Sequence, residues 1–125
     1  MSDAISTFFD AWQLESGDAR LEKITGSVTK NIQYDDPRTP QTVNGIDALN
    51  EYVGMFSANA PGWTAKVVGS DTTAGMVRAT VAFGGTGPDG KEMIQLGQYF
   101  VQMEGELIGR MVGFVGTGAP DNSSE

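Results

Sequence analysis

The sequence predicts an α+β domain in which a curved antiparallel sheet forms a cone and three helices from the first half of the chain pack on its concave face. Apolar residues recur with a helical period before the Ala60-Pro61-Gly62 break and with a period of two after it. Short Gly-containing turns separate the alternating segments, as in hairpins. A curled sheet covered by helices on one side leaves a conical cavity, and such cavities bind small apolar molecules.

Three helices are predicted in the first half of the chain. Residues 3–15 form the first, because apolar side chains have the spacing of one helix face at Ile5, Phe8, Phe9 and Trp12. Ser16-Gly17 ends it, and Asp18 can cap a second short helix whose apolar spacing continues to Val28. The third helix follows Asn44-Gly45, and its apolar face consists of Ile46, Leu49, Val53 and Phe56.

Five strands are predicted, one between the helices and four after them. Alternation over residues 31–36 places Ile32, Tyr34 and Asp36 on one face. Pro37 ends this strand because proline cannot donate to a ladder, and residues 37–43 form a loop. The other four strands are expected at residues 63–69, 76–84, 93–103 and 107–115.

The length of 125 residues predicts a single domain, which we place at residues 1–116. At this size, folding buries roughly two thirds of the surface of the unfolded chain, enough for a core and a pocket. Residues 117–125 contain no apolar anchor, so we expect a disordered tail there.

The composition excludes several classes of function. The chain has no His and no Cys, which excludes Ser-His-Asp and Cys-His nucleophile systems and thiol redox sites. We expect no metal site and no cofactor. With 16 acidic and 8 basic residues, the net charge of −8 disfavours nucleic acid and anionic membranes as partners. The N-terminus has no basic signal region and no long apolar run follows, so we expect a cytoplasmic protein.

Asp36 is the candidate catalytic residue, with Tyr34 on the same strand face to orient the ligand. Apolar surroundings would raise the pKa of such a carboxyl group and make it a usable base. The alternative is that Asp35 and Asp36 are turn-forming acids that face water, and the local pattern alone favours this alternative.

The candidate ligand-binding residues are aromatic side chains at positions expected to face the cavity, together with one glutamine on the long third strand of the final four. Aromatic residues at such spacings are more often part of the core than of a binding site. The set consists of Phe9, Trp12, Phe56, Trp63, Phe83, Gln95, Tyr99 and Phe114.

The order of the elements and three local patterns resemble the nuclear transport factor 2-like superfamily, nearest its SnoaL-like and ketosteroid isomerase-like branches. These patterns are Ser16-Gly17-Asp18, Tyr34-Asp35-Asp36-Pro37 followed by Gly45-Ile46-Asp47-Ala48-Leu49, and Glu104-Gly105-Glu106-Leu107-Ile108 before Phe114. The resemblance covers residues 4–115. It implies a cystatin-like, cone-shaped α+β barrel that often forms a homodimer through the outer sheet face, with a pocket used for isomerisation, cyclisation, dehydration, hydrolysis or binding.

The resemblance also implies residue roles. Asp36 falls where ketosteroid isomerases keep the Asp that moves the proton. Phe9 or Asp10 stands where those enzymes place an oxyanion-binding Tyr, and Gly97 lies near the position of their protonated acid. The oxyanion donors of those enzymes are therefore absent from these positions.

Two hypotheses follow. In the first, a small apolar molecule occupies the pocket and Asp36 carries out a proton transfer of the isomerase, cyclase or lyase type. In the second, the protein is a non-catalytic binding or dimeric assembly module whose pocket is filled by its own side chains. The size of the cavity and the orientation of Asp36 distinguish between them.

Overall fold

The computed structural model describes residues 4–14, 16–59, 62–87 and 89–116. Helix α1 (Ala4–Asp10) continues into the short 3₁₀ helix η1 (Ala11–Gln13), and helices α2 (Gly17–Thr25) and α3 (Ile46–Asn59) follow. The strands are β1 (Val28–Asp35), β2 (Val43–Asn44), β3 (Thr64–Thr73), β4 (Met76–Thr86), β5 (Glu92–Glu104) and β6 (Leu107–Val115). The tail predicted at residues 117–125 lies outside the described residues.

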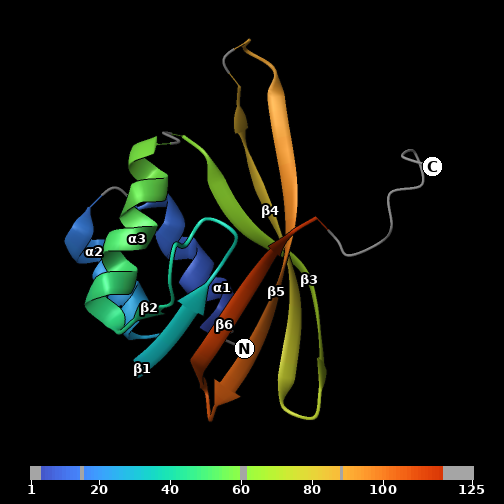
Figure 1. Ribbon diagram of the computed structural model, residues 1–125. Coiled ribbons are helices and arrows are strands. Elements are labelled where there is room, and N and C mark those ends of the chain that lie inside the picture. The colour runs from blue at the N-terminus through green and yellow to red at the C-terminus, as the bar shows by residue number, and fades with distance from the viewer. Residues whose placement is uncertain (1–3, 15, 60–61, 88, 117–125) are drawn as a thin grey trace.

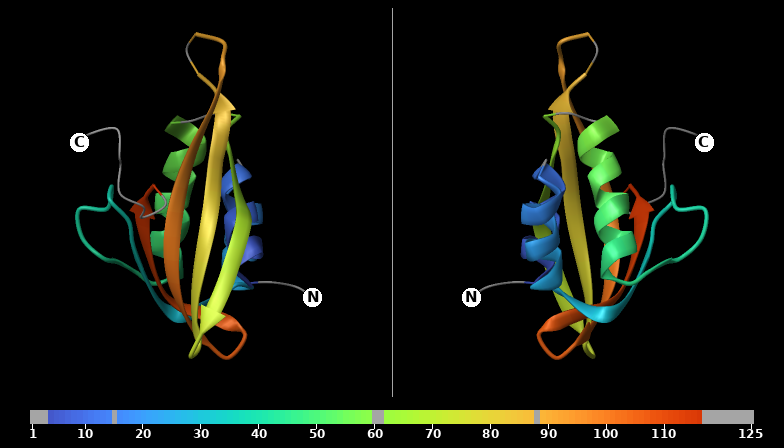
Figure 2. Two further views of the ribbon diagram at one scale, coloured as in Figure 1. Left: turned by 90° about the vertical axis from the view of Figure 1, so that its right-hand side faces the viewer. Right: turned by 90° about the vertical axis from the view of Figure 1, so that its left-hand side faces the viewer.

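The predicted fold class is confirmed: three helices cover one face of a single curved sheet (Figures 1 and 2). The strand order is β2-β1-β6-β5-β4-β3. The sheet differs from the wholly antiparallel expectation, because β1 pairs with β6 in parallel while the other neighbours are antiparallel. It is also open, with β2 at one edge and β3 at the other.

Local chemistry explains how several boundaries differ from those expected. Ser16, not Asp18, caps α2, since its hydroxyl accepts from the Ala19 amide at 3.3 Å. Val28 belongs to β1 rather than to the second helix. Ladder pairing with β4 extends β3 through the expected loop to Thr73, which leaves Ala74 and Gly75 as a tight turn. Both residues have positive φ, 51° and 81°, as a two-residue turn of this type requires.

The core lies between α1, η1 and the concave face of the sheet. Phe8 and Phe9 of α1 and Trp12 of η1 are almost fully buried there, together with Tyr34 of β1. Arg20 of α2 fixes the position of α3, because its guanidinium donates to Asn50 Oδ1 at 2.9 Å and to the Leu14 carbonyl at 3.0 Å. These contacts place the inner face of α3 opposite the end of β1.

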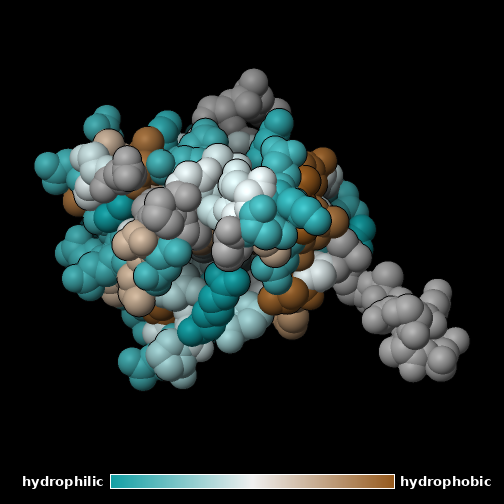
Figure 3. Space-filling model, turned by 90° about the horizontal axis from the view of Figure 1, so that it is seen from above, coloured by the Kyte–Doolittle hydropathy of each residue, from teal (hydrophilic) through white to brown (hydrophobic). Residues whose placement is uncertain are grey.

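The described part of the chain contains no helix that is both long enough and apolar enough to span a bilayer. Hydrophilic residues cover most of the end that carries the β4–β5 hairpin, and hydrophobic residues form small separate groups on it (Figure 3). Clusters of three or more acidic side chains that could hold a metal ion do not occur among the described residues.

Candidate functional site

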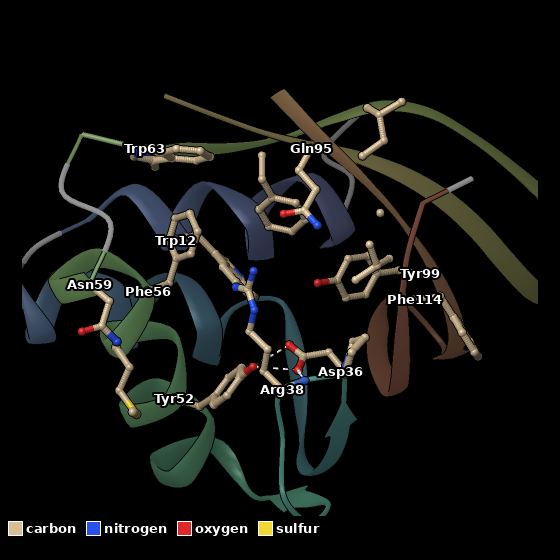
Figure 4. A pocket seen from close by; sticks show the side chains of 16 residues that line it. Trp12, Asp36, Arg38, Tyr52, Phe56, Asn59, Trp63, Gln95, Tyr99 and Phe114 are labelled. Carbon is tan, nitrogen blue, oxygen red and sulfur yellow. Dashed lines mark hydrogen bonds between the residues drawn. The ribbon is translucent and has the colours of Figure 1, made fainter. Parts of the chain in front are cut away.

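A pocket of about 430 Å³ lies between α3, the loop after β1 and the concave face of the sheet. This volume lies in the range of about 300–1,000 Å³ that is usual for small-molecule sites. Seven of the sixteen lining residues are aromatic, and a few polar side chains reach the pocket from the loop after β1, from α3 and from β5 (Figure 4). The residues that line it are Trp12, Asp36, Pro37, Arg38, Tyr52, Met55, Phe56, Asn59, Trp63, Phe83, Gln95, Leu96, Gly97, Tyr99, Phe114 and Val115.

Asp36 follows directly after β1, and its carboxylate lies in the pocket wall. Its Oδ1 accepts hydrogen bonds from the backbone amides of Arg38 at 2.8 Å and Thr39 at 3.1 Å. Asp36 is therefore a turn-forming acid whose carboxylate also lines the pocket, and its role as a base stays a prediction. The turn fixes the carboxylate in place without using a side chain from the opposite wall.

Two tyrosines donate to the same carboxylate. The Tyr34 hydroxyl donates to Oδ2 at 2.8 Å. The Tyr52 hydroxyl lies 2.7 Å from Oδ1 and 2.6 Å from Oδ2 (Figure 4). Behind them, the hydroxyl oxygens of Tyr34 and Tyr99 are 3.1 Å apart. Since the single hydroxyl proton of Tyr34 is directed to Asp36, Tyr99 donates to Tyr34. The three tyrosines of the chain thus form one network around one carboxylate.

Burial keeps this network protonated. Burial is the largest cause that raises the pKa of Tyr34 well above its usual value, and the charge of Asp36 adds to it. Burial also raises the pKa of Tyr99. For Tyr52, burial and then the hydrogen bond to Asp36 raise the pKa. All three hydroxyls are therefore neutral at neutral pH, so Tyr34 and Tyr52 remain donors to Asp36 and Tyr99 remains a donor to Tyr34.

A dense group of aromatic rings forms the apolar wall. The Trp12 ring lies 5.2 Å from that of Phe56 and 5.7 Å from that of Phe83, in tilted and edge-on arrangements. Such pairs are worth about 0.5–1.5 kcal/mol beyond their buried area, so they hold one another in place. Trp63 closes one end of the wall above Gly85, where any larger side chain would overlap its ring.

Eight of the ten predicted site residues line the pocket: Trp12, Asp36, Phe56, Trp63, Phe83, Gln95, Tyr99 and Phe114. Phe114 does so at the border, since its ring packs against Phe100 with centroids 5.6 Å apart and the residue is 54% exposed. The other two lie outside the lining. Tyr34 is fully buried behind Asp36, and Phe9 is buried against Tyr99 with ring centroids 4.9 Å apart.

Sequence reasoning missed three polar residues of the pocket, Tyr52, Asn59 and Arg38. Tyr52 could have been found, because it lies three residues after Leu49 and four before Phe56 on the same face of the third helix. Arg38 lies in a loop without periodicity, so no pattern predicts the direction of its side chain.

The sequence matches no protein-family model and no curated protein. The structure is similar to that of a candidate isomerase of the SnoaL-like family from Agrobacterium tumefaciens str. C58. The TM-score is 0.76 with 21% identity, over 91% of this chain and 95% of that chain. The chain has the nuclear transport factor 2-like fold.

Two further solved structures are similar to this chain. One is a protein with a ketosteroid isomerase-like fold from Catenulispora acidiphila DSM 44928, in complex with trimethylamine (TM-score 0.73, 12% identity, 90% of this chain and 85% of that one). The other is a candidate SnoaL-like polyketide cyclase from Jannaschia sp. CCS1 (TM-score 0.69, 13% identity, 90% and 84%). At these identities the likeness establishes the fold, and function must come from the site.

Proposed function

We propose that this protein binds a small, largely apolar molecule in the pocket and catalyses a proton transfer on it with Asp36 as the base. The reaction would be of the isomerase, cyclase or lyase type. The observation that carries the proposal is a carboxylate, held by two neutral tyrosines, in the wall of an open aromatic pocket. The open volume of about 430 Å³ speaks against the alternative of a pocket filled by its own side chains.

The hydrogen bonds of Asp36 indicate how it would become reactive. Four donors form hydrogen bonds to the Asp36 carboxylate, which offers about four acceptor sites. One of these hydrogen bonds must therefore break before Asp36 can accept a proton from a ligand. Tyr52 is the donor that can leave, since it is only partly buried and shares its proton between both oxygens. A ligand carbonyl that accepts from Tyr52 would free one lone pair of Asp36 towards the ligand.

Deuterium exchange tests the proposal without knowledge of the natural substrate. The probe is 2-tetralone, an apolar bicyclic ketone with acidic hydrogens on the benzylic carbon beside the carbonyl. In D₂O, the protein should accelerate exchange at that carbon, as followed by proton NMR. Asp36→Asn should reduce the acceleration by about a hundredfold or more, in line with the usual contribution of general base catalysis of about 10²–10⁴.

Asp35→Asn is the matched control. Asp35 is the neighbouring carboxylate, but it accepts from Thr42 at 2.9 Å and lies 3.8 Å from Arg110, away from the pocket lining. This variant should exchange 2-tetralone at the rate of the unmodified protein. Equal rates for Asp36→Asn and the unmodified protein would refute Asp36 as the base.

The outer face of the sheet supports the further proposal that two copies of the chain form a homodimer through it. Cross-strand pairing places Leu96, Phe100 and Phe114 on this face, and they are 37%, 39% and 54% exposed. Phe100→Asp would add a charge at the centre of this group. It should convert a dimer into a monomer in sedimentation velocity, and a monomeric unmodified protein would refute the interface.

A further inference from the structure

Arg38 is the one cationic side chain among the described residues that line the pocket. Its backbone amide donates to Asp36, which fixes the start of its side chain beside the carboxylate. The side chain then extends into the pocket from below Asp36 (Figure 4). Its charge is close enough to the Tyr52 and Tyr99 hydroxyls to lower the pKa of both, against the opposing effect of burial.

The guanidinium of Arg38 has no hydrogen-bond or ion-pair partner among the described residues. The obvious partner, Asp36, already accepts hydrogen bonds from four donors, one of which is the backbone amide of Arg38 itself. The ion pairs among the described residues do not include Arg38. They are Arg78–Asp71 and Arg110–Asp35, and their members lie outside the pocket lining. Arg38 therefore presents free donors to whatever occupies the pocket.

We infer that Arg38 binds a negatively charged oxygen of the ligand, and that the pocket takes small apolar molecules that carry such an oxygen, a carboxylate for example. This inference rests on the proposed function and names its substrate class.

The inference is tested by calorimetric titration with two ligands of similar shape and different charge. 2-Naphthoate carries a permanent anionic oxygen beside an apolar ring, and 2-acetonaphthone is its neutral counterpart. Arg38→Gln keeps the backbone amide that holds Asp36 and removes only the charge. Arg110→Gln makes the same change in net charge outside the pocket and serves as the control.

Arg38→Gln should weaken 2-naphthoate binding at least about tenfold, the lower end for a hydrogen bond between charged groups. It should change 2-acetonaphthone binding less than about threefold, because the neutral ligand keeps its apolar contacts. Arg110→Gln should change neither. Asp36→Asn should bind 2-naphthoate more tightly than the unmodified protein does, because the side chain at position 36 is then neutral and does not repel the carboxylate of the ligand.

The outcomes separate this inference from the proposed function. If Arg38→Gln binds 2-naphthoate as tightly as the unmodified protein while 2-acetonaphthone also binds, the role of Arg38 is overturned and the pocket remains a ligand site. If neither compound binds any variant, both proposals are overturned. If Arg38→Gln loses 2-naphthoate but Asp36→Asn retains 2-tetralone exchange, the anion site stands and the base is elsewhere.

Discussion

Replacing Gly113 with alanine should destabilise the protein and disturb its pocket, because Tyr99 occupies the space above this glycine. The two residues are directly paired across β5 and β6. A Cβ atom at Gly113 would lie 2.8 Å from Cζ and 2.9 Å from Cδ2 of the Tyr99 ring. Such distances are too short for carbon atoms, so the ring would have to move, and its hydroxyl would move away from Tyr34.

The expected size of the effect follows from two opposing contributions. Overpacking by one methyl group costs about 1–3 kcal/mol. Alanine also restricts the unfolded chain, which offsets about 0.4–1 kcal/mol. The net loss in the free energy of unfolding should therefore be about 1–2 kcal/mol, or roughly 4–10 °C in Tm for a domain of this size.

Urea denaturation followed by circular dichroism measures this loss, with Gly69→Ala as the control. Gly69 also lies in a strand, and a Cβ there would meet no atom within 4 Å. The cost at Gly113 should nearly vanish in a Tyr99→Leu background, since the ring that the methyl group meets is then gone. Equal costs in both backgrounds, or a Gly113→Ala protein as stable as Gly69→Ala, would refute the reasoning.

Three further predictions concern the tyrosines and the tryptophan wall. Tyr34→Phe should lower the free energy of unfolding by about 1–3 kcal/mol in urea titrations, because it breaks the bond to Asp36 and leaves Tyr99 without its acceptor. The raised pKa values of Tyr34 and Tyr99 make the free energy of unfolding depend on pH. The contribution of these two tyrosines is complete below about pH 10, where tyrosine is neutral in the unfolded chain too, and it decreases as the pH rises above that value. The slope should be roughly 1.4 kcal/mol per pH unit for each of these two buried groups, with tyrosinate absorbance developing together with unfolding rather than before it. Gly85→Ala should displace Trp63, since its Cβ would lie 2.6 Å from the indole Cδ2, and a red shift of the tryptophan emission would report it.

The fold was predictable from the sequence because most of its elements have strong internal periodicity. Helix α3 and strands β4 to β6 lie close to their expected positions, since each has one apolar face against the core. The parallel alignment of β1 with β6 was not predictable, because alternation within a strand carries no information on the direction of its neighbour. The extension of β3 to Thr73 arises from pairing with β4 and not from its own polar residues.

The site was predictable where its residues lie on regular elements. Tyr99 could be placed because period-two alternation assigns it to one side of the sheet, and Asp36 continues the alternation of Ile32 and Tyr34 one residue beyond the end of β1. The face of Phe114 follows from its pairing with Gln98, which places it on the outer side of the sheet, and this depends on the register between strands. The bonds from Tyr52 and the direction of Arg38 depend on the turn after β1, where hydrogen bonds between side chain and backbone set the geometry.

The parallel pairing of β1 with β6 has a consequence for how the protein folds. Asp36 reaches the pocket only when an early strand docks beside the last one, which closes a loop that contains most of the domain. The antiparallel hairpins from β3 to β6 need only short connections and can form before this step. We therefore expect ligand binding to recover later during refolding than the circular dichroism signal of the sheet, so that a competent pocket marks the end of folding.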